Sequence, residues 1–504
     1  MISQALREET ARGRAMTTQC FRQIARSAPV VVVLLLAAVT ASAGDGGTTL
    51  GQVVGAVLAH KRWLVIAAAV LSILLGVWLA ARGKKRALLG LAAVVLVGCL
   101  AFLVLELNQR YPNQGLLSLE RYRDSVAILL GTDIRLARFK PEPVLKVDRE
   151  RVPRAAYSAI DVHFHLESLS PTIDAERLVQ AMDAAGIAKI VDLGGLPEDF
   201  KQAAKNFTAR YPDRIVQFVK PDIAAVVADK RGFEAGVAEQ VRWIDEAARL
   251  GAQGVKVSKS LGTGQIDQDG HLVPVDDPRL DPLWARAGQL GMPVLIHTGE
   301  PAAFSLPADE HNERYDELRA SPDAGRYGKP PSREELFAQR ERLLSRHPET
   351  NFIGAHFGMQ EDDLAQVAAL LDKYPNYYVD IAAVIQALGR QPITAREFFI
   401  KYQDRVLFGT DGGWGLVTRE PGWTPERLYR DYFEFLETSN EYFEYPFGDT
   451  AHQGRWRIYG IDLPNDVLEK VYFRNAEKLI PTRAAVLAGL GAAGVARVPA
   501  AAAK

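Results

Sequence analysis

Cysteine is almost absent from this chain of 504 residues, which holds only Cys20 and Cys99. Both lie before residue 108, so the long C-terminal part contains no thiol. This scarcity excludes a disulfide framework and a thiolate metal cluster. An excess of charge of one sign is missing too, because 60 basic residues face 61 acidic ones and the formal net charge is -1. We therefore expect no nucleic-acid partner, and function has to be sought in local sites.

Long apolar runs are confined to the N-terminal part, where they predict a membrane module. Residues 29–43 follow Arg22 and Arg26 and end in small residues, so residues 1–43 form either a secretory signal or a first membrane segment. Within residues 44–107, the runs 63–81 and 87–105 each approach the roughly 20 apolar residues of a transmembrane helix. The membrane is therefore an expected partner.

The charged residues around these runs predict an orientation. The short loop 82–86, Arg-Gly-Lys-Lys-Arg, belongs in the cytoplasm by the positive-inside rule, which places everything after residue 107 outside. Lys61 and Arg62 favour the opposite orientation, an inverted hairpin with a cytoplasmic C-terminal part. Residues 108–153 turn polar and contain Pro141, Pro143 and Pro153, as expected of a juxtamembrane linker.

The remaining chain alternates short β-branched runs with longer amphipathic segments, the pattern of βα units and a parallel sheet. Helices are predicted between the strands, for example over 175–185, 237–250, 333–346 and 361–371. The eight predicted strands are 159–165, 188–194, 214–220, 254–259, 292–298, 351–357, 376–381 and 405–410.

Eight strands predict a closed α/β fold, a (β/α)8 TIM barrel over residues 154–480, followed by an alanine-rich tail over 481–504. An open doubly wound sheet is the alternative, although no glycine-rich phosphate fingerprint follows the first strand. Long connections follow the fifth and eighth strands, at 299–350 and 412–463. We expect residues 312–314 and 452–456 of these loops to help form a pocket.

Polar side chains stand at the ends of several predicted strands. His163 and His165 are two residues apart on the first strand and so point to one face. His297 ends the fifth strand, His356 ends the sixth and Asp411 follows the eighth. These five groups converge on one mouth of a barrel, and imidazoles with a carboxylate suit a divalent ion such as zinc.

The pattern resembles the amidohydrolase superfamily, in particular its amidohydrolase-related branch. The resemblance is carried by Asp161-Val162-His163-Phe164-His165, His297, His356 and Gly409-Thr410-Asp411, and it spans about residues 159–480. It implies that His163, His165, His297 and Asp411 bind the metal, and that His356 is a further ligand or an acid/base group. Asp161 is then either a residue behind the ligands or a plain hydrogen-bonding residue at the barrel mouth.

Lys256 lies on the fourth strand, where binuclear members of the superfamily carry a carboxylated lysine between two metals. Lysine also occurs there in mononuclear relatives, as a contact for an anionic substrate. We expect one metal, zinc by its ligands.

The resemblance implies a metal-dependent hydrolase that activates water to cleave an amide, lactone or ester bond of a small-molecule substrate, with Asp411 and His356 as catalytic groups. A lyase acting on a carboxylated ring or diene is the alternative, and a substrate carboxylate would then need Arg314, Arg390 or Arg455. A non-catalytic membrane receptor or scaffold is the third reading. The sequence predicts no oligomeric state.

Overall fold

The computed structural model describes residues 142–166, 174–413, 425–445 and 454–493, with Gly83 and Val95 as isolated positions. The chain divides into two units, Met1–Pro143 and Val144–Lys504. The predicted signal-like segment 1–43 and the apolar runs 63–81 and 87–105, apart from Val95, lie outside the described residues. Among the helices that are described, none is long and apolar enough to cross a bilayer. The membrane module therefore stays a prediction.

The second unit is built on a sheet whose strands all pair in parallel, as predicted. Its hydrogen-bonded order is β8-β7-β6-β5-β4-β3-β2-β1-β9. The strands are β1 (Ala159–His165), β2 (Ile187–Asp192), β3 (Ile215–Val219), β4 (Ala252–Val257), β5 (Val294–Ile296), β6 (Phe352–Gly354), β7 (Tyr377–Asp380), β8 (Val406–Leu407) and β9 (Gly412–Gly413).

One short stretch of chain closes this sheet into a barrel. Residues 406–413 pair with β7 through β8 and with β1 through β9. Between these two strands, the amide of Val162 donates to the carbonyl of Phe408, and the amide of Asp411 donates to the carbonyl of His163. β8 and β9 together therefore serve as the eighth strand of a (β/α)8 barrel.

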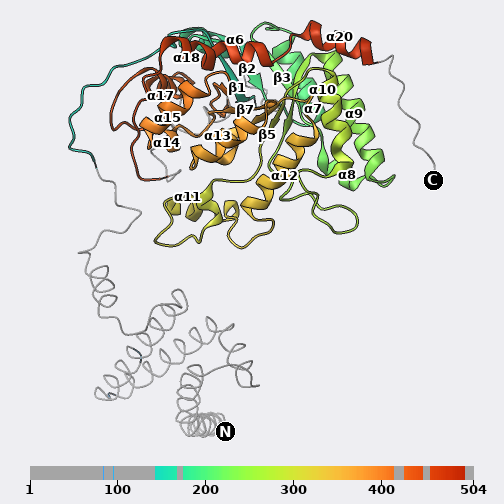
Figure 1. Cartoon of the computed structure of the whole chain (residues 1–504), viewed down its shortest axis with the longest axis horizontal. Coiled ribbons are helices and arrows are strands. Elements are labelled where there is room, and N and C mark those ends of the chain that lie inside the picture. The colour runs from blue at the N-terminus through green and yellow to red at the C-terminus, as the bar shows by residue number, and fades with distance from the viewer. Residues whose placement is uncertain are drawn as a thin grey trace, which may run out of the picture. The chain divides into compact units, whose positions relative to one another are not determined.

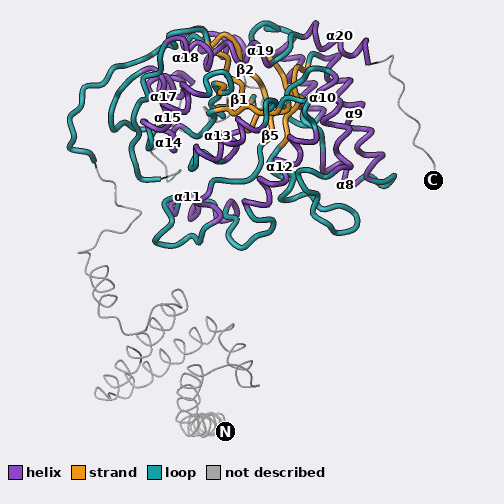
Figure 2. The backbone as a smooth tube through the Cα atoms, in the orientation of Figure 1, coloured by secondary structure: helices purple, strands orange, loops and turns teal. Residues whose placement is uncertain are grey.

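Helices follow the strands and lie outside them, while the strands gather in the interior (Figure 1; Figure 2). The helices are α6 (Ala175–Ala185), α7 (Pro197–Ala203), α8 (Ile223–Ala228), α9 (Phe233–Leu250), α10 (Asp281–Gln289), α11 (Tyr315–Ala320), α12 (Arg333–Arg346), α13 (Leu364–Lys373), α14 (Ile385–Leu388), α15 (Pro392–Lys401), α17 (Pro425–Glu437), α18 (Asn465–Glu469), α19 (Asn475–Leu479) and α20 (Arg483–Ala493).

Local sequence explains the helix ends. Asp174 caps α6 by accepting from the amides of Glu176 and Arg177, and Gly186 ends it in the left-handed conformation at φ 80°. Gly251 ends α9 in the same way, at φ 116°. A β-branched or bulky residue would be strained at either C-terminal position.

Apolar side chains fill the barrel interior beneath its mouth. Leu295, Ile353 and Leu407 belong to one buried cluster with Val216 and Phe218. Gly254 makes room for this packing, because a Cβ atom there would lie 2.4 Å from the Phe218 ring. The barrel is therefore a packed core, and polar chemistry is left to its rim.

Two C-terminal segments complete the unit. The aromatic residues Tyr429, Tyr432 and Phe433 of α17 belong to the core, because all three are at most 2% exposed. The alanine-rich segment 481–504, expected to be a frayed helix or a tail, begins with α20, in which Val486 is fully buried. Residues 494–504 lie outside the described part of the chain.

Candidate functional site

His163 and His165 reach the barrel mouth because β1 is irregular near its end. The pairing of β1 with β2 shifts register between Asp161 and Phe164. Asp161 hydrogen bonds Tyr429 of α17, on the helix side of the sheet, whereas His163 and His165 both contact Asp411 at the mouth. The bulge therefore separates Asp161 from the histidines with which strict alternation would have grouped it.

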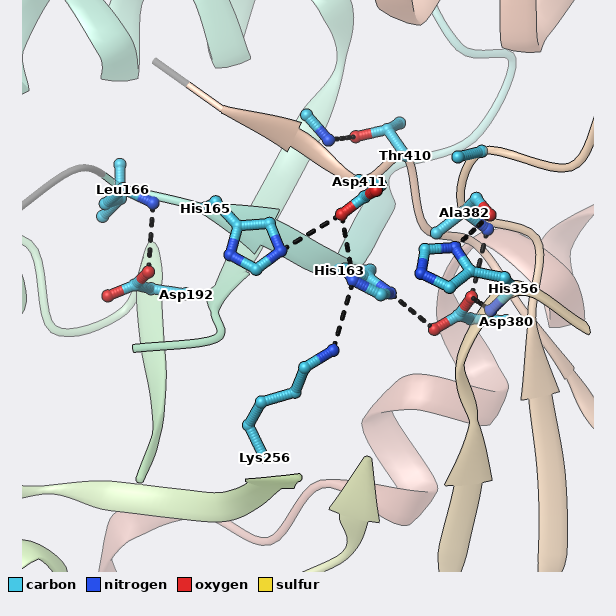
Figure 3. Close-up of polar contacts among 12 residues, drawn as sticks. His163, His165, Leu166, Asp192, Lys256, His356, Asp380, Ala382, Thr410 and Asp411 are labelled. Atoms are coloured by element: carbon cyan, nitrogen blue, oxygen red, sulfur yellow. Dashed lines mark hydrogen bonds and ion pairs between the residues drawn. The ribbon is translucent and has the colours of Figure 1, made fainter. Parts of the chain in front are cut away.

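Asp411 sits between the two histidines of β1 (Figure 3). Its Oδ1 lies 3.1 Å from Nε2 of His163 and 3.1 Å from Nε2 of His165. Its backbone is left-handed, at φ 59°, which few residues other than glycine, asparagine and aspartate adopt readily. The strained turn lies between β8 and β9, where the chain closes the barrel, and it directs the carboxylate of Asp411 toward β1.

Asp380, the last residue of β7, is a further member of the site that the sequence analysis did not identify. Its Oδ2 lies 2.9 Å from Nδ1 of His163, while its Oδ1 accepts from the amides of His356 and Ala382. The carboxyl is fully buried. Asp380 thereby fixes the ring of one histidine and the backbone of another, as carboxylates behind metal-binding histidines do. Its position at a strand end was the signal that could have revealed it.

His356 is placed by an unusual turn that begins where β6 ends. Residues 356–359 all have positive φ, and three of them are not glycine. The Nδ1 atom of His356 donates to the carbonyl of Ala382 at 2.8 Å, so Nε2 is the ring nitrogen left for the site. Its ring lies 4.8 Å from that of His163 and 4.5 Å from that of His297, measured between centroids.

His297 follows β5 and contributes a nitrogen without a partner. Its Nε2 is buried and has no hydrogen bond with any described residue. A buried imidazole nitrogen left without a partner costs free energy that a ligand can recover. The His297 ring packs against that of His356, which in turn lies beside His163, so the structure brings all five strand-end groups of the sequence analysis together.

The charges suit a divalent ion. Burial lowers the pKa of His297 well below its usual value, that of His356 to about 4 and that of His165 below its usual value. Burial would raise the pKa of Asp411, but the charge of His163 and hydrogen bonds from His163 and His165 outweigh it and hold the pKa well below the usual range. Neutral imidazoles and an ionised carboxylate are the forms that bind metals.

The spacing agrees with the charges. The ligand atoms of His163, His165 and Asp411 lie within 4.8 Å of one another, and so do those of His163, His356 and Asp380. Burial and Lys256 lower the pKa of His163, but Asp380 and Asp411 raise it overall, so a positive charge between the two carboxylates is favoured. A divalent ion can take the place of that charge, and the residues present therefore fit a metal.

Asp161 has the hydrogen-bonding role that was one of its two predicted readings. Its Oδ1 accepts from the amides of His163 and Thr410, and its Oδ2 accepts from the hydroxyls of Thr410 and Tyr429. Burial raises its pKa to about 6. It ties β1 to the segment that carries Asp411 without touching the cluster of ligand atoms itself.

Lys256 points from β4 toward the same cluster. Its Nζ lies 3.5 Å from Nε2 of His163, and its side chain is buried (Figure 3). Burial lowers its pKa to about 8. The lysine is thus near the proposed ligands, but its predicted role toward a substrate or a second metal stays a prediction.

A cavity of about 450 Å³ opens onto the site. Among the residues that line it are His297, His356, Asp411, Arg314, Lys259 and Glu361. Of the three arginines considered for a substrate carboxylate, only Arg314 lines this cavity, and its Nε donates to Glu317 at 2.7 Å.

The other two arginines lie apart from the site cavity. Arg390 lines an adjoining cavity of about 390 Å³, where it pairs with Glu313 and lies 4.0 Å from the Trp456 ring centre. Arg455 pairs with Asp316. Of the two predicted pocket segments, residues 312–314 contribute Arg314 to the site cavity, while residues 452 and 453 lie outside the described part of the chain.

Glu361 is a second residue that the sequence analysis missed. It lines both cavities, is 3% exposed, and its Oε2 has no hydrogen bond with a described residue. Burial raises its pKa from 4.5 to about 7. The folded protein therefore holds this proton up to about pH 7, whereas the unfolded chain releases it near pH 4.5.

We expect the free energy of unfolding to fall as the pH rises from 4.5 to 7, by roughly 2–3 kcal/mol from this group, because the folded state binds the extra proton there. Glu361→Gln should remove that part of the pH dependence. Urea unfolding at pH 5 and pH 8 measures it, with the exposed Glu349→Gln as the control. Equal pH dependence in Glu361→Gln and the wild-type protein would contradict the assignment.

Comparisons with known proteins agree with this architecture. The amidohydrolase family model matches residues 160–482. No curated protein matches the chain. Among solved structures, an uncharacterised TIM-barrel protein from Bordetella bronchiseptica is 18% identical, with a TM-score of 0.39 over 66% of this chain and 99% of that one.

Two further solved structures are similar at the same level. A probable 2-pyrone-4,6-dicarboxylic acid hydrolase from Acinetobacter baumannii is 12% identical, with a TM-score of 0.38 over 64% of this chain and 98% of that one. A dihydroxybenzoic acid decarboxylase from Polaromonas sp. JS666 with bound manganese is 17% identical, with a TM-score of 0.38 over 64% and 96%. The family match covers well over half of the chain, and this protein belongs to the amidohydrolase family of metal-dependent enzymes.

Proposed function

We propose that this enzyme is a hydrolase that cleaves an amide, lactone or ester bond of a small molecule with the help of one divalent ion. His163, His165, His297 and Asp411 would hold the ion, and zinc suits this set of nitrogen and oxygen donors. The observation that carries the proposal is the carboxylate of Asp411, which lies between two imidazoles and lines the cavity.

When bound at such a site, a divalent ion supplies an activated water at neutral pH and polarises a carbonyl group. Asp411 presents Oδ1 to both histidines of β1, which leaves Oδ2 to accept a proton from the attacking water. Asp411 then returns that proton to the leaving amine or alcohol. His356, oriented by its hydrogen bond to Ala382, presents an unprotonated Nε2 that would bind the ion or accept a proton.

A screen of the full-length, metal-loaded protein against lactones, amides, esters and aromatic carboxylic acids tests this proposal. His163→Ala is the blank, because it removes one ligand and leaves the cavity open. Hydrolysis of any of the first three classes supports the proposal. Release of carbon dioxide from the aromatic acids, without hydrolysis of any lactone, amide or ester, would contradict the proposed hydrolase and identify the enzyme as a lyase.

The lyase is kept as a second candidate because one observation favours it. Arg314 lines the site cavity and is 6% exposed, so it places a buried cation where a substrate carboxylate could bind. Arg390 and Arg455 do not line this cavity, so Arg314 alone represents the predicted arginine set. Arg314→Met should raise KM for an acidic substrate and leave KM for a neutral ester unchanged.

Removal of the metal is expected to abolish turnover. Dialysis against a chelator at pH 7 should lower activity at least about a hundred-fold, because no described residue replaces the Lewis acid. Adding back one equivalent of zinc should restore activity, and zinc or manganese content by elemental analysis identifies the natural ion. Full activity in a protein shown to be metal-free would contradict the metal-dependent mechanism.

A further inference from the structure

A fully buried arginine lies beneath the turn that carries His356. Arg340, on α12, is 0% exposed and has no carboxylate partner among the described residues. Its guanidinium instead lies 4.8 Å from the Phe337 ring centre and 5.4 Å from that of Tyr377. Burying a cation without an opposite charge costs free energy, so its contacts need an explanation beyond the filling of space.

Those contacts converge on the left-handed turn. Arg340 donates through Nη1 to the carbonyl of Gly358 at 2.6 Å, and through Nη2 to Oε1 of Gln360. Arg333, on the same helix, donates to the carbonyl of Met359 at 2.6 Å. Residues 356–359 all have positive φ, a conformation that costs of order 1–3 kcal/mol at each residue other than glycine.

The turn has little freedom to relax. A Cβ atom at Gly358 would lie 2.4 Å from the Tyr377 hydroxyl and 3.1 Å from Nη1 of Arg340. At its start, Asp380 accepts from the amide of His356. The backbone of the turn is therefore held at its beginning by Asp380 and at its end by Arg340 and Arg333, so the point from which the His356 ring projects depends on both ends.

We infer that Arg340 is a positioning residue for His356, acting through the left-handed turn of residues 356–359 although it does not touch the site itself. The inference rests on the proposed function, because it assumes that His356 either binds the metal or transfers a proton. Without Arg340, the carbonyl of Gly358 and the side-chain oxygen of Gln360 lose their donor, and the turn can revert to ordinary φ values. The imidazole would then move away from His163 and His297.

A double-mutant cycle tests this inference. The variants are Arg340→Met, His356→Asn and the pair, and the readouts are kcat/KM and the metal dissociation constant measured by competition with a chelator. His356→Asn should weaken kcat/KM, metal binding or both. Arg340→Met should weaken the same readout by about ten- to a hundred-fold, the usual range for residues behind a metal ligand. In the His356→Asn background, Arg340→Met should weaken the same readout further by less than about two-fold, because the histidine that Arg340 positions is already absent.

Arg342→Met is the matched control, because Arg342 lies on the same helix and pairs with Asp276 and Glu335 away from the turn. It should leave both readouts unchanged. Arg340→Lys keeps the charge but cannot donate two parallel hydrogen bonds. Its kcat/KM and metal dissociation constant should therefore lie between those of Arg340→Met and the wild-type protein. If Arg340→Met does not fold, Gln360→Met removes one of the two acceptors and should give a smaller loss in the same readout.

Equal losses from Arg340→Met in both backgrounds would overturn the inference, and so would a lower melting temperature with neither readout changed. If His356→Asn itself changes neither readout, His356 has no role and the inference fails with it. The proposed hydrolysis is tested separately, by the substrate screen and by Asp411, so the two failures can be told apart.

Discussion

Asp411→Asn is expected to lower kcat by roughly 10³–10⁴-fold, because it removes the group that accepts and returns the proton. Asparagine keeps an oxygen for His163 and His165, which both contact Oδ1 of Asp411 at 3.1 Å. It also tolerates φ 59° better than most residues, so the backbone should not move. The loss is therefore chemical, and the folded structure should remain.

Steady-state kinetics on the substrate found by the screen, together with circular dichroism and thermal unfolding, checks this result. The exposed Asp404, which pairs with Lys470, supplies the control variant Asp404→Asn. That control should retain full activity. Near wild-type turnover in Asp411→Asn would remove this residue from the mechanism, and the general base would have to be sought elsewhere in the cavity.

Asp380→Asn is expected to weaken metal binding by about ten- to a hundred-fold. The carboxylate accepts from Nδ1 of His163, which favours the tautomer in which the neutral ring would offer Nε2 to a metal. An amide in its place presents an N–H group to Nδ1 and favours the other tautomer, with the proton on Nε2. The amides of His356 and Ala382 keep their acceptor, because asparagine retains one oxygen.

The metal dissociation constant, measured with a competing chelator, is the readout. Asp192→Asn is the matched control, since Asp192 is also a buried strand-end aspartate, but its Oδ1 accepts from the backbone amides of Leu166 (Figure 3) and Gly194 and from no histidine of the site. Both variants should lose some stability, and only Asp380→Asn should lose metal affinity. Equal metal affinity in the two variants would show that Asp380 serves the fold and not the site.

The sequence predicted the barrel and the strand-end groups because both follow from local periodicity. β1 and α12 have the predicted bounds, and β2 to β8 overlap the predicted ranges, whereas β9 lies just beyond the last of them. Histidine is rare in the chain, so its position at strand ends was informative. Closure by residues 406–413 was implied by the strand count, although the division of that stretch into β8 and β9 was not.

The residues that were missed share a physical reason. Asp380 looks like any aspartate after a short apolar run, and Arg340 is one of several charged residues in α12. Their importance comes from tertiary contacts with His163, His356 and Gly358, which no spacing rule reports. The bulge in β1 likewise depends on pairing with β2, so the side of the sheet on which Asp161 lies was not predicted.

The closing stretch of residues 406–413 also dictates an order of events during synthesis. His163 and His165 leave the ribosome early, whereas Asp411, which completes their cluster, leaves only after the seven preceding strands. Until then β1 is an unpaired edge that can attract other nascent chains. The closed barrel and the contact of Asp411 with His163 and His165 therefore form in the same step, and a metal bound as proposed would enter the complete site only after the barrel has closed.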